Sequence, residues 1–174
     1  MFFMNVLGNY AEEMAQCVQH NPHHCVNGHY TSVLEHTKLV YNALPECAPE
    51  ILKLTAVLHD VGKPVVKTTD EKGDRFFNHA KISVEIANKL LREHTDLSEE
   101  EIAAVLTLIE THDNIGGMKA IRKYRNRHGD YLTRLHLVFR YADIMGQTPE
   151  ERAGKLEELA EAFRCYETLA EADL

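Results

Sequence analysis

Four histidines and two aspartates stand on or beside apolar helix faces, or at helix ends, along this sequence. They are His36, His59, Asp60, His79, His112 and Asp143. Buried imidazole and carboxylate groups are costly unless they are paired or bound to a metal. A divalent transition metal offers that compensation, because imidazole suits such ions and one aspartate can give an oxygen to each of two ions. These residue types therefore predict a metal site, with Asp60 as the natural bridge.

The spacing of apolar residues identifies the helices that must hold these side chains. A helix is expected after Ser32, which forms a capping box with Glu35 and precedes the first histidine of the set. A second helix is expected from Pro49 to a stop at residues 62–64, which places the pair His59-Asp60 at its C-terminal end.

Three later segments carry the other ligands. His79 lies in the first turn of one predicted helix, and His112 closes another that opens at the capping box of Ser98 with Glu101. That helix is expected to break at residues 114–117, which contain Asn114 and Gly116-Gly117. Residues 65–77 are interpreted as a loop or small hairpin, and residues 130–147 as the helix carrying Asp143. Thr148, Pro149 and Glu151 predict a third capping box, which opens a last helix toward Leu169.

Length and composition describe an ordinary globular chain. The 174 residues suffice for one domain, 1–174, and with no convincing period-2 alternation the pattern predicts an all-α bundle of about seven or eight helices. A net charge of −8 disfavours bulk nucleic-acid or membrane-surface binding. The sequence shows neither a signal peptide nor a long apolar stretch, and its four cysteines have no Cys-x-x-Cys spacing. We therefore expect a soluble, cytoplasmic protein with reduced thiols.

The ligand motifs resemble those of a known family. His36, the pair His59-Asp60 within Leu58-His-Asp-Val-Gly-Lys-Pro64, and the distant Asp143 are similar to the HD superfamily of metal-dependent phosphohydrolases. The resemblance covers about residues 29–147. Residues 76–80 and 140–147 look most like the HD modules found beside transfer-RNA nucleotidyltransferase domains, although no nucleotidyltransferase domain is recognised here. Nucleotide transfer is therefore not expected.

The resemblance implies a ligand set. His36, His59, Asp60 and Asp143 would bind one divalent ion. His79 and His112 resemble the extra ligands of binuclear members, in which the aspartate of the dyad bridges to a second ion. If the resemblance is set aside, these two histidines are simply located at helix ends, one near the positive and one near the negative end of a helix dipole. The sequence does not distinguish Fe, Mn, Mg, Ni, Co or Zn, nor one ion from two.

Phosphoester hydrolysis would give each group a task. Hydroxide derived from metal-bound water attacks phosphorus, with Asp60 holding the ions. Lys63 is the candidate that contacts the phosphate and offsets developing charge, and Lys81 is a second substrate-binding candidate. His29, seven residues before the first ligand, is a candidate at the pocket edge. The expected partner is a small phosphorylated substrate, such as a nucleotide, while the oligomeric state stays open.

Two further clusters invite other interpretations. Residues 119–127 carry five basic groups, which either rim the pocket near a Gly-Gly lid or form a solvated amphipathic helix. A crowded run of cysteines and histidines could hold zinc, although its spacing fits no zinc finger well; the run is Cys17, His20, His23, His24, Cys25 and His29.

Three functions remain in competition at this point. The first is a phosphohydrolase acting on a phosphomonoester or phosphodiester. The second is a di-iron oxygenase, because histidine-rich sites suit iron. The third is a nucleotide-sensing module without turnover, which intact metal ligands argue against.

Overall fold

The computed structural model describes residues 2–26, 28–113 and 117–171. The helices are α1 (Phe2–Leu7), α2 (Tyr10–Gln16), the 3-10 helix η1 (Pro22–His24), α3 (Val33–Ala43), α4 (Glu50–Leu58), α5 (Lys63–Val66), α6 (His79–His94), α7 (Glu99–Thr111), α8 (Gly117–Met145) and α9 (Pro149–Glu171). The strands are β1 (Cys25–Val26), β2 (His29–Tyr30), β3 (Thr68–Asp70) and β4 (Gly73–Arg75). The predicted all-α class is confirmed, since these strands form only two small antiparallel hairpins.

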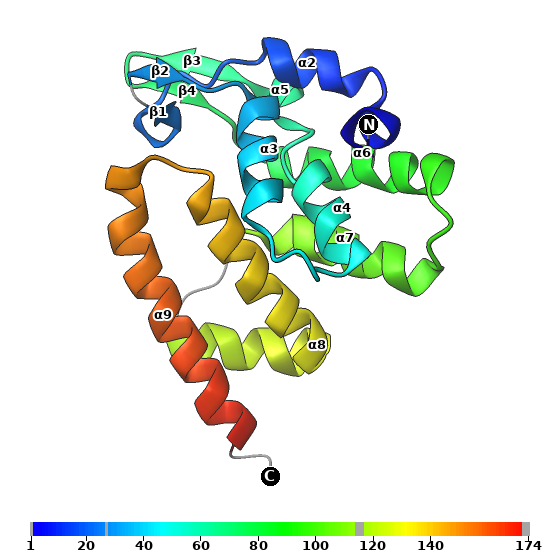
Figure 1. The fold of residues 1–174 in the computed structure, drawn as a ribbon, viewed down its shortest axis with the longest axis vertical. Helices are drawn as coiled ribbons and strands as arrows, with labels where there is room; N and C mark the ends of the chain where they lie inside the picture. Colours follow the sequence, from blue (N-terminus) through cyan, green and yellow to red (C-terminus); the bar gives the residue numbers. More distant parts are fainter. Residues whose placement is uncertain (1, 27, 114–116, 172–174) are drawn as a thin grey trace.

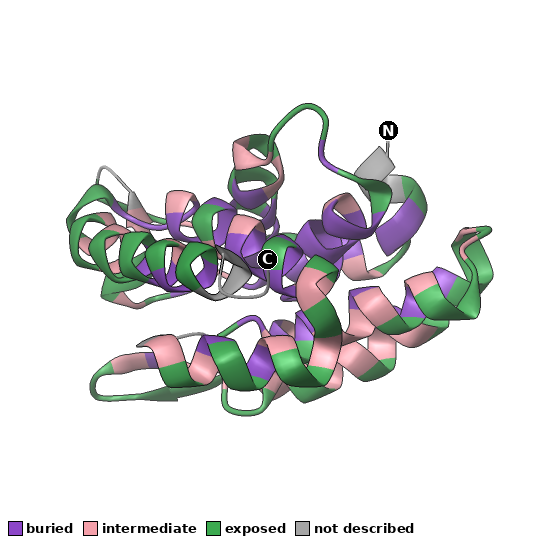
Figure 2. Cartoon of the chain, turned by 90° about the horizontal axis from the view of Figure 1, so that it is seen from below, coloured by how far each residue is buried: buried purple, intermediate pink, exposed green. Residues whose placement is uncertain are grey.

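Helices α3 and α4 lie at the centre of the molecule, and the other helices pack around them (Figure 1). Helices α6 and α7 pack on each other, α7 also contacts α4, and the second half of α8 packs along α3. The most deeply buried side chains include Leu54 and Leu58 on α4, Leu91 on α6, Leu108 on α7 and Phe139 on α8. Figure 2 shows buried residues on the faces that helices turn toward one another and exposed residues on their outer faces.

Helix starts follow the predicted capping chemistry. Ser32 and Glu35 form a reciprocal capping box at α3, and Ser98 and Glu101 form another at α7. The predicted stop after the His-Asp pair is only partly correct. Pro64 does not terminate helical structure, because it lies in the first turn of the short helix α5. At that position a backbone N–H has no partner within the helix, so its absence in proline costs no hydrogen bond.

The third predicted capping box is only half formed. The N–H of Glu151 donates to Oγ1 of Thr148 at 3.4 Å, as expected at the start of α9. The Glu151 carboxylate, however, lies 2.9 Å from Nδ1 of His23 and does not return to the Thr148 backbone. The N–H of Thr148 donates instead to the carbonyl oxygen of His23, at 3.3 Å. The start of α9 is thus tied to η1.

Helix α8 changes direction at Gly129, which has φ 83° and ψ 170°. Such a positive φ suits glycine, and it separates the basic first half from the second half that approaches the core. Within the basic half, Ile121 and Tyr124 are buried, while Lys119, Arg122, Lys123 and others are exposed. The plain amphipathic-helix interpretation of this stretch therefore holds in the described residues. The predicted break and lid at Asn114 and Gly116 lie outside them.

A buried carboxylate anchors the β3–β4 hairpin to the segment that leads into η1. Asp74 accepts hydrogen bonds from the N–H of His20 at 2.8 Å and from Oγ1 of Thr69 at 2.7 Å, and it pairs with Nζ of Lys67 at 2.8 Å. Lys67 also donates to the carbonyl oxygen of Val18 at 2.5 Å. These contacts hold residues 18–24 against the rest of the fold.

None of the described helices combines the length and apolar character that a membrane span requires.

The four cysteines are all free thiols, as the sequence predicts. They are Cys17, Cys25, Cys47 and Cys165.

Candidate metal centre

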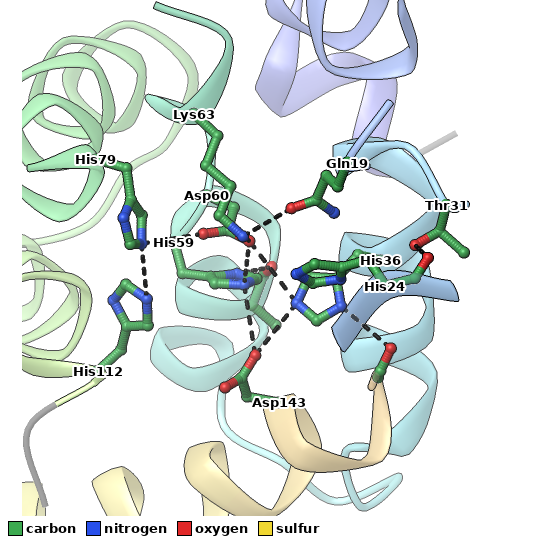
Figure 3. A network of polar contacts seen from close by, with 12 residues as sticks. Gln19, His24, Thr31, His36, His59, Asp60, Lys63, His79, His112 and Asp143 are labelled. Atoms are coloured by element: carbon green, nitrogen blue, oxygen red, sulfur yellow. Dashed lines mark hydrogen bonds and ion pairs between the residues drawn. The ribbon is translucent and has the colours of Figure 1, made fainter. Parts of the chain in front are cut away.

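The six predicted ligands come from five separate segments and meet in one place. His36 lies on α3, His59 and Asp60 follow α4, His79 begins α6, His112 follows α7, and Asp143 lies near the end of α8. Figure 3 shows Asp60 between two groups, with His36, His59 and Asp143 on one side and His79 and His112 on the other. All six are buried except His79, which is partly buried.

The first group is His36, His59 and Asp143. Nε2 of His36 lies 3.2 Å from Oδ1 of Asp143, and Nε2 of His59 lies 3.9 Å from the same oxygen. Oδ2 of Asp60 also faces this group, at 3.2 Å from His59 Nε2 and 3.7 Å from His36 Nε2. Four ligand atoms therefore surround one small space.

The second group is Asp60, His79 and His112. Its aspartate uses the other oxygen, because Oδ1 of Asp60 lies 3.4 Å from Nε2 of His79. Nε2 of His79 and Nε2 of His112 are 3.2 Å apart. In each group the potential ligand atoms lie within 4.8 Å of one another. The two oxygens of Asp60 thus face two different groups, as a bridging carboxylate requires.

The tautomer of each histidine follows from its backbone partner. In all four histidines Nδ1 lies 2.7–3.2 Å from a backbone carbonyl oxygen. A carbonyl oxygen can only accept a hydrogen bond, so Nδ1 must be the donor. The pairs are His36 with Gly146, His59 with Ala56, His79 with Phe76, and His112 with Ile109. In the neutral ring Nε2 then carries a lone pair that points into the site. Fixing the second nitrogen in this way is the usual support for a metal-binding imidazole.

Several buried atoms of the site have no hydrogen-bond partner among the residues that the structure describes. They include Nε2 of His59 and Oδ1 of Asp60. The facing Nε2 atoms of His79 and His112 also place two lone pairs against each other, which is repulsive unless a cation lies between them. Such groups are costly to bury without compensation. Two divalent ions fit this donor set of four imidazoles and two carboxylates.

The carboxylates of the site are held in their charged form. Burial opposes ionisation of Asp60, but the charges of His59 and Lys63 outweigh it and keep the pKa of Asp60 well below its usual range. Burial likewise opposes ionisation of Asp143, and the hydrogen bond and charge of His36 more than offset it, so its pKa is also lowered. Arg140 adds a hydrogen bond to Asp143 at 2.9 Å. The carboxylates of Asp60 and Asp143 are therefore negatively charged and can bind cations.

The histidines differ in their protonation. Burial would lower the pKa of His59, but the negative charge of the adjacent Asp60 raises it overall. Burial lowers the pKa of His112. Because a metal binds only the neutral ring, protonation of His59 would oppose binding of an ion at the first group.

Lys63 lies directly beside the dyad. Its Nζ is 2.8 Å from Oδ2 of Asp60 and donates to Oε1 of Gln19 at 2.9 Å, and the residue is buried. The structure therefore places Lys63, the predicted catalytic lysine, beside the candidate metal-binding groups. Gln19 was not predicted as a site residue, because nothing in its local sequence distinguishes it.

A cavity of about 190 Å³ opens onto both groups. Its described lining adds six residues to five of the ligands, namely His23, His24, Lys63, Asp113, Gln147 and Lys155. Sequence reasoning missed five of these as pocket residues. Asp113 follows a ligand, and Gln147 is one turn after Asp143, so their spacing was a usable signal. His24 and Lys155 gave none.

His24 belongs to the crowded run that suggested a zinc site. The run disperses in the structure, because His20 binds Asp74, His23 binds Glu151 and the ring of His24 lies edge-on to His36, with centroids 4.7 Å apart. In the described residues, the candidate metal groups are the two at Asp60. Burial, assisted by the charges of Lys63 and His36, lowers the pKa of His24 to about 2, so its ring is neutral.

Two predicted substrate contacts are not brought to the cavity. Lys81 is exposed on α6 and His29 is exposed on β2, and neither is among the described residues that line the cavity. Lys81 lies only two residues after a ligand, but the two side chains leave the helix in different directions.

Close backbone approach requires glycine at two positions of the site. A Cβ on Gly62 would lie 2.6 Å from the backbone nitrogen of Ser83 and 2.8 Å from the carbonyl oxygen of His79. A Cβ on Gly146 would lie 2.9 Å from Cε1 of His36. These glycines let α6 and the end of α8 bring their ligands close to the dyad.

Comparison with known families agrees with this geometry. The family model described as HD domain matches residues 26–156, which is most of the chain. The chain therefore belongs to the HD domain family, whose members are generally metal-dependent hydrolases. Searches of curated proteins and of solved structures gave no match.

Proposed function

We propose that this protein is a metal-dependent phosphohydrolase that cleaves a phosphomonoester or phosphodiester of a nucleotide or another small metabolite. The observation that supports it best is the pair of ligand groups that share Asp60, at a cavity that also contains the Lys63 ammonium. When bound, the divalent ions would supply a water of lowered pKa and Lewis acids for the phosphoryl oxygens.

The protein's own side chains would perform the remaining tasks. His36, His59 and Asp143 would hold one ion, His79 and His112 the other, and Asp60 both. Lys63 would exchange its contact with Asp60 for a phosphate oxygen and offset the negative charge that grows on the leaving oxygen. Gln19 accepts a hydrogen bond from Lys63 and would keep the ammonium aimed at the cavity.

The direct test is a hydrolysis assay on protein purified without chelator and loaded in turn with Mg, Mn, Co, Ni or Fe. Substrates would be aryl phosphates, 2′-, 3′- and 5′-nucleotides and cyclic nucleotides, with oxygen uptake recorded on the iron form. We expect metal-dependent phosphate release. Oxygen uptake without phosphate release would favour an oxygenase, and tight nucleotide binding without turnover would favour a sensor.

A further inference from the structure

Every described side chain that lines the cavity is polar or charged. Most ligand pockets are lined mainly by apolar and aromatic side chains and enclose roughly 300–1,000 Å³. This cavity is smaller, about 190 Å³, and its described wall presents imidazoles, carboxylates, ammonium groups and an amide. Such a wall suits a small hydrophilic ligand.

Two phenylalanine rings lie beside residues of the candidate metal centre, and neither lines the cavity. Phe139 is fully buried behind His59, with ring centroids 5.3 Å apart. The Lys63 ammonium lies 5.2 Å from the centroid of the Phe76 ring. Proteins commonly bind a nucleobase by stacking it on an exposed aromatic or apolar face. Neither of these rings lines the cavity, so neither offers that face to a ligand there.

His24 offers a hydrogen bond that the described protein does not use. Its ring lines the cavity, the residue is only 7% exposed, and Nδ1 has no hydrogen-bond partner. Thr31 fixes the segment by donating from its N–H to the His24 carbonyl oxygen at 2.8 Å. In Figure 3 His24 lies beside His36, on the side of Asp60 opposite to His79 and His112. A buried nitrogen without a partner points to a ligand group that meets it.

Further polar groups belong to the same side of the cavity. Gln147 directly follows Gly146, whose carbonyl oxygen accepts from His36. Nζ of Lys155 donates to Oε1 of Gln147 at 2.5 Å and lies 3.6 Å from Oε2 of Glu151. The ammonium and the amide are therefore held together at the wall formed by α9 and the turn before it.

We propose that the substrate is a compact phosphomonoester whose remaining part carries hydroxyl or carboxylate groups and lacks a nucleobase. Its phosphate would lie at the metal centre beside Lys63, and its polar part would contact His24, Gln147 and Lys155. Water would form a new bond to phosphorus, the ester P–O bond would break, and the leaving alkoxide would take up a proton. This proposal rests on the proposed function and narrows it.

The first experiment compares kcat/KM among phosphate esters on the metal-loaded protein. Glycerol 3-phosphate, 3-phosphoglycerate and ribose 5-phosphate represent the proposed class, 5′-nucleotides represent the alternative, and an aryl phosphate serves as the generic substrate. We expect the best member of the first class to exceed every nucleotide by at least tenfold. A nucleotide preference would overturn this inference and leave the proposed hydrolase intact.

Two variants test the proposed contacts. His24→Phe and Lys155→Met should each raise KM for the best hydroxylated ester about tenfold, with metal content unchanged and KM for the aryl phosphate within about twofold. The matched controls, His94→Phe and Lys89→Met, change exposed side chains of α6 and should have no effect. Unchanged KM in both cavity variants would contradict the proposal.

A binding measurement separates this inference from the function it rests on. If no ester is hydrolysed, the hydrolase proposal fails. Calorimetric titration with phosphonate analogues then compares the same two ligand classes on the metal-loaded protein. Tighter binding of the hydroxylated phosphonates would support the ligand class proposed here, and tighter binding of nucleoside phosphonates would overturn it.

Discussion

Asp60 and Lys63 touch each other, yet their substitutions should have different consequences. Among the described carboxylates, Asp60 is the one that faces both groups, so we expect Asp60→Ala to lose bound metal and hydrolysis. The substitution also leaves the buried Lys63 ammonium without its carboxylate partner, which lowers stability. Lys63 keeps its hydrogen bond to Gln19, and we expect the helical content to be retained. Lys63→Ala should keep the metal and lower kcat about 10²–10³-fold, the usual effect of losing one charge-stabilising donor. Metal analysis, circular dichroism and phosphate release measure these effects.

The comparison needs one control at the same scale. Lys89→Ala removes an exposed ammonium from α6 and should change neither metal content nor turnover. Full metal content in Asp60→Ala would show that another residue joins the two groups.

His79 and His112 should hold one ion and not the other. Their Nε2 atoms face each other and the Oδ1 side of Asp60, away from the first group. Replacing both by alanine should therefore reduce bound metal from about two equivalents to about one, as measured by elemental analysis after dialysis. Loss of both equivalents, or of neither, would require a different ligand set.

The six candidate ligands could be predicted from the sequence because each is a metal-binding residue type that lies on or beside an apolar helix face, or at a helix end. His24 and Gln19 lacked such a signal. Both belong to residues 17–25, where no helical period marks the inward face. This segment is held in place by Asp74, which binds His20 from 54 positions away. Long-range contacts of this kind are not encoded in local spacing.

Helices were easier to predict than their joints. Ser32 and Ser98 mark helix starts because a side-chain oxygen within three residues satisfies a free N–H. The joint at Glu151 differed from expectation, because a partner from η1 competes for its carboxylate. Pro64 was taken as a stop, but proline is equally suited to a first helical turn.

At the contact between α5 and α6, glycine is a packing requirement. Gly62→Ala would place a methyl group 2.6 Å from a backbone nitrogen of α6, which cannot rotate away. We expect a loss of about 1–3 kcal/mol in the free energy of unfolding, measured in urea without metal, together with weaker binding of the second ion. The second ion would bind more weakly because the added methyl group would displace His79.

Gly154→Ala is the matched control for this substitution. A Cβ at Gly154 meets nothing within 4 Å, and the position is inside helix α9. Alanine should stabilise it by up to about 1 kcal/mol. Equal effects at the two glycines would contradict the packing argument.

The hairpin anchor should depend on pH. Burial raises the pKa of Asp74, but hydrogen bonds from Lys67, Thr69 and His20 outweigh it, so its net pKa is well below the usual range. Its stabilisation is therefore complete above the pKa of an unfolded aspartate, about 3.9, and is lost as the pH falls toward the lower folded pKa. Asp74→Asn should cost about 1–3 kcal/mol at pH 7.

That difference should shrink steadily in unfolding measurements made at pH 4, 3 and 2.5. A difference that stays constant from pH 7 to pH 2.5 would mean that shape, and not the charge of Asp74, holds the hairpin.

For the whole molecule, bound ions should add stability, because the folded chain presents six ligands together and the unfolded chain does not. At 100 times the dissociation constant one site contributes about 2.7 kcal/mol. Chelation should therefore lower Tm by roughly 5–10 °C for a chain of this size. Calorimetry with and without chelator tests this expectation. The Asp60→Ala variant should show no such dependence, and an unchanged or higher Tm of the native chain in chelator would contradict it.

His36 and Asp143 are 107 positions apart in the sequence, yet Nε2 of His36 lies 3.2 Å from Oδ1 of Asp143. An ion held by both would act as a cross-link that closes a very long loop, and a covalent link across about 100 residues removes about 4.7 kcal/mol of chain entropy from the unfolded state. The same entropy would oppose ion capture by an unfolded chain, since α3, α4 and α8 must first be in place. We therefore expect loading to follow folding, so that refolding rates are indifferent to metal while unfolding rates fall as metal is added.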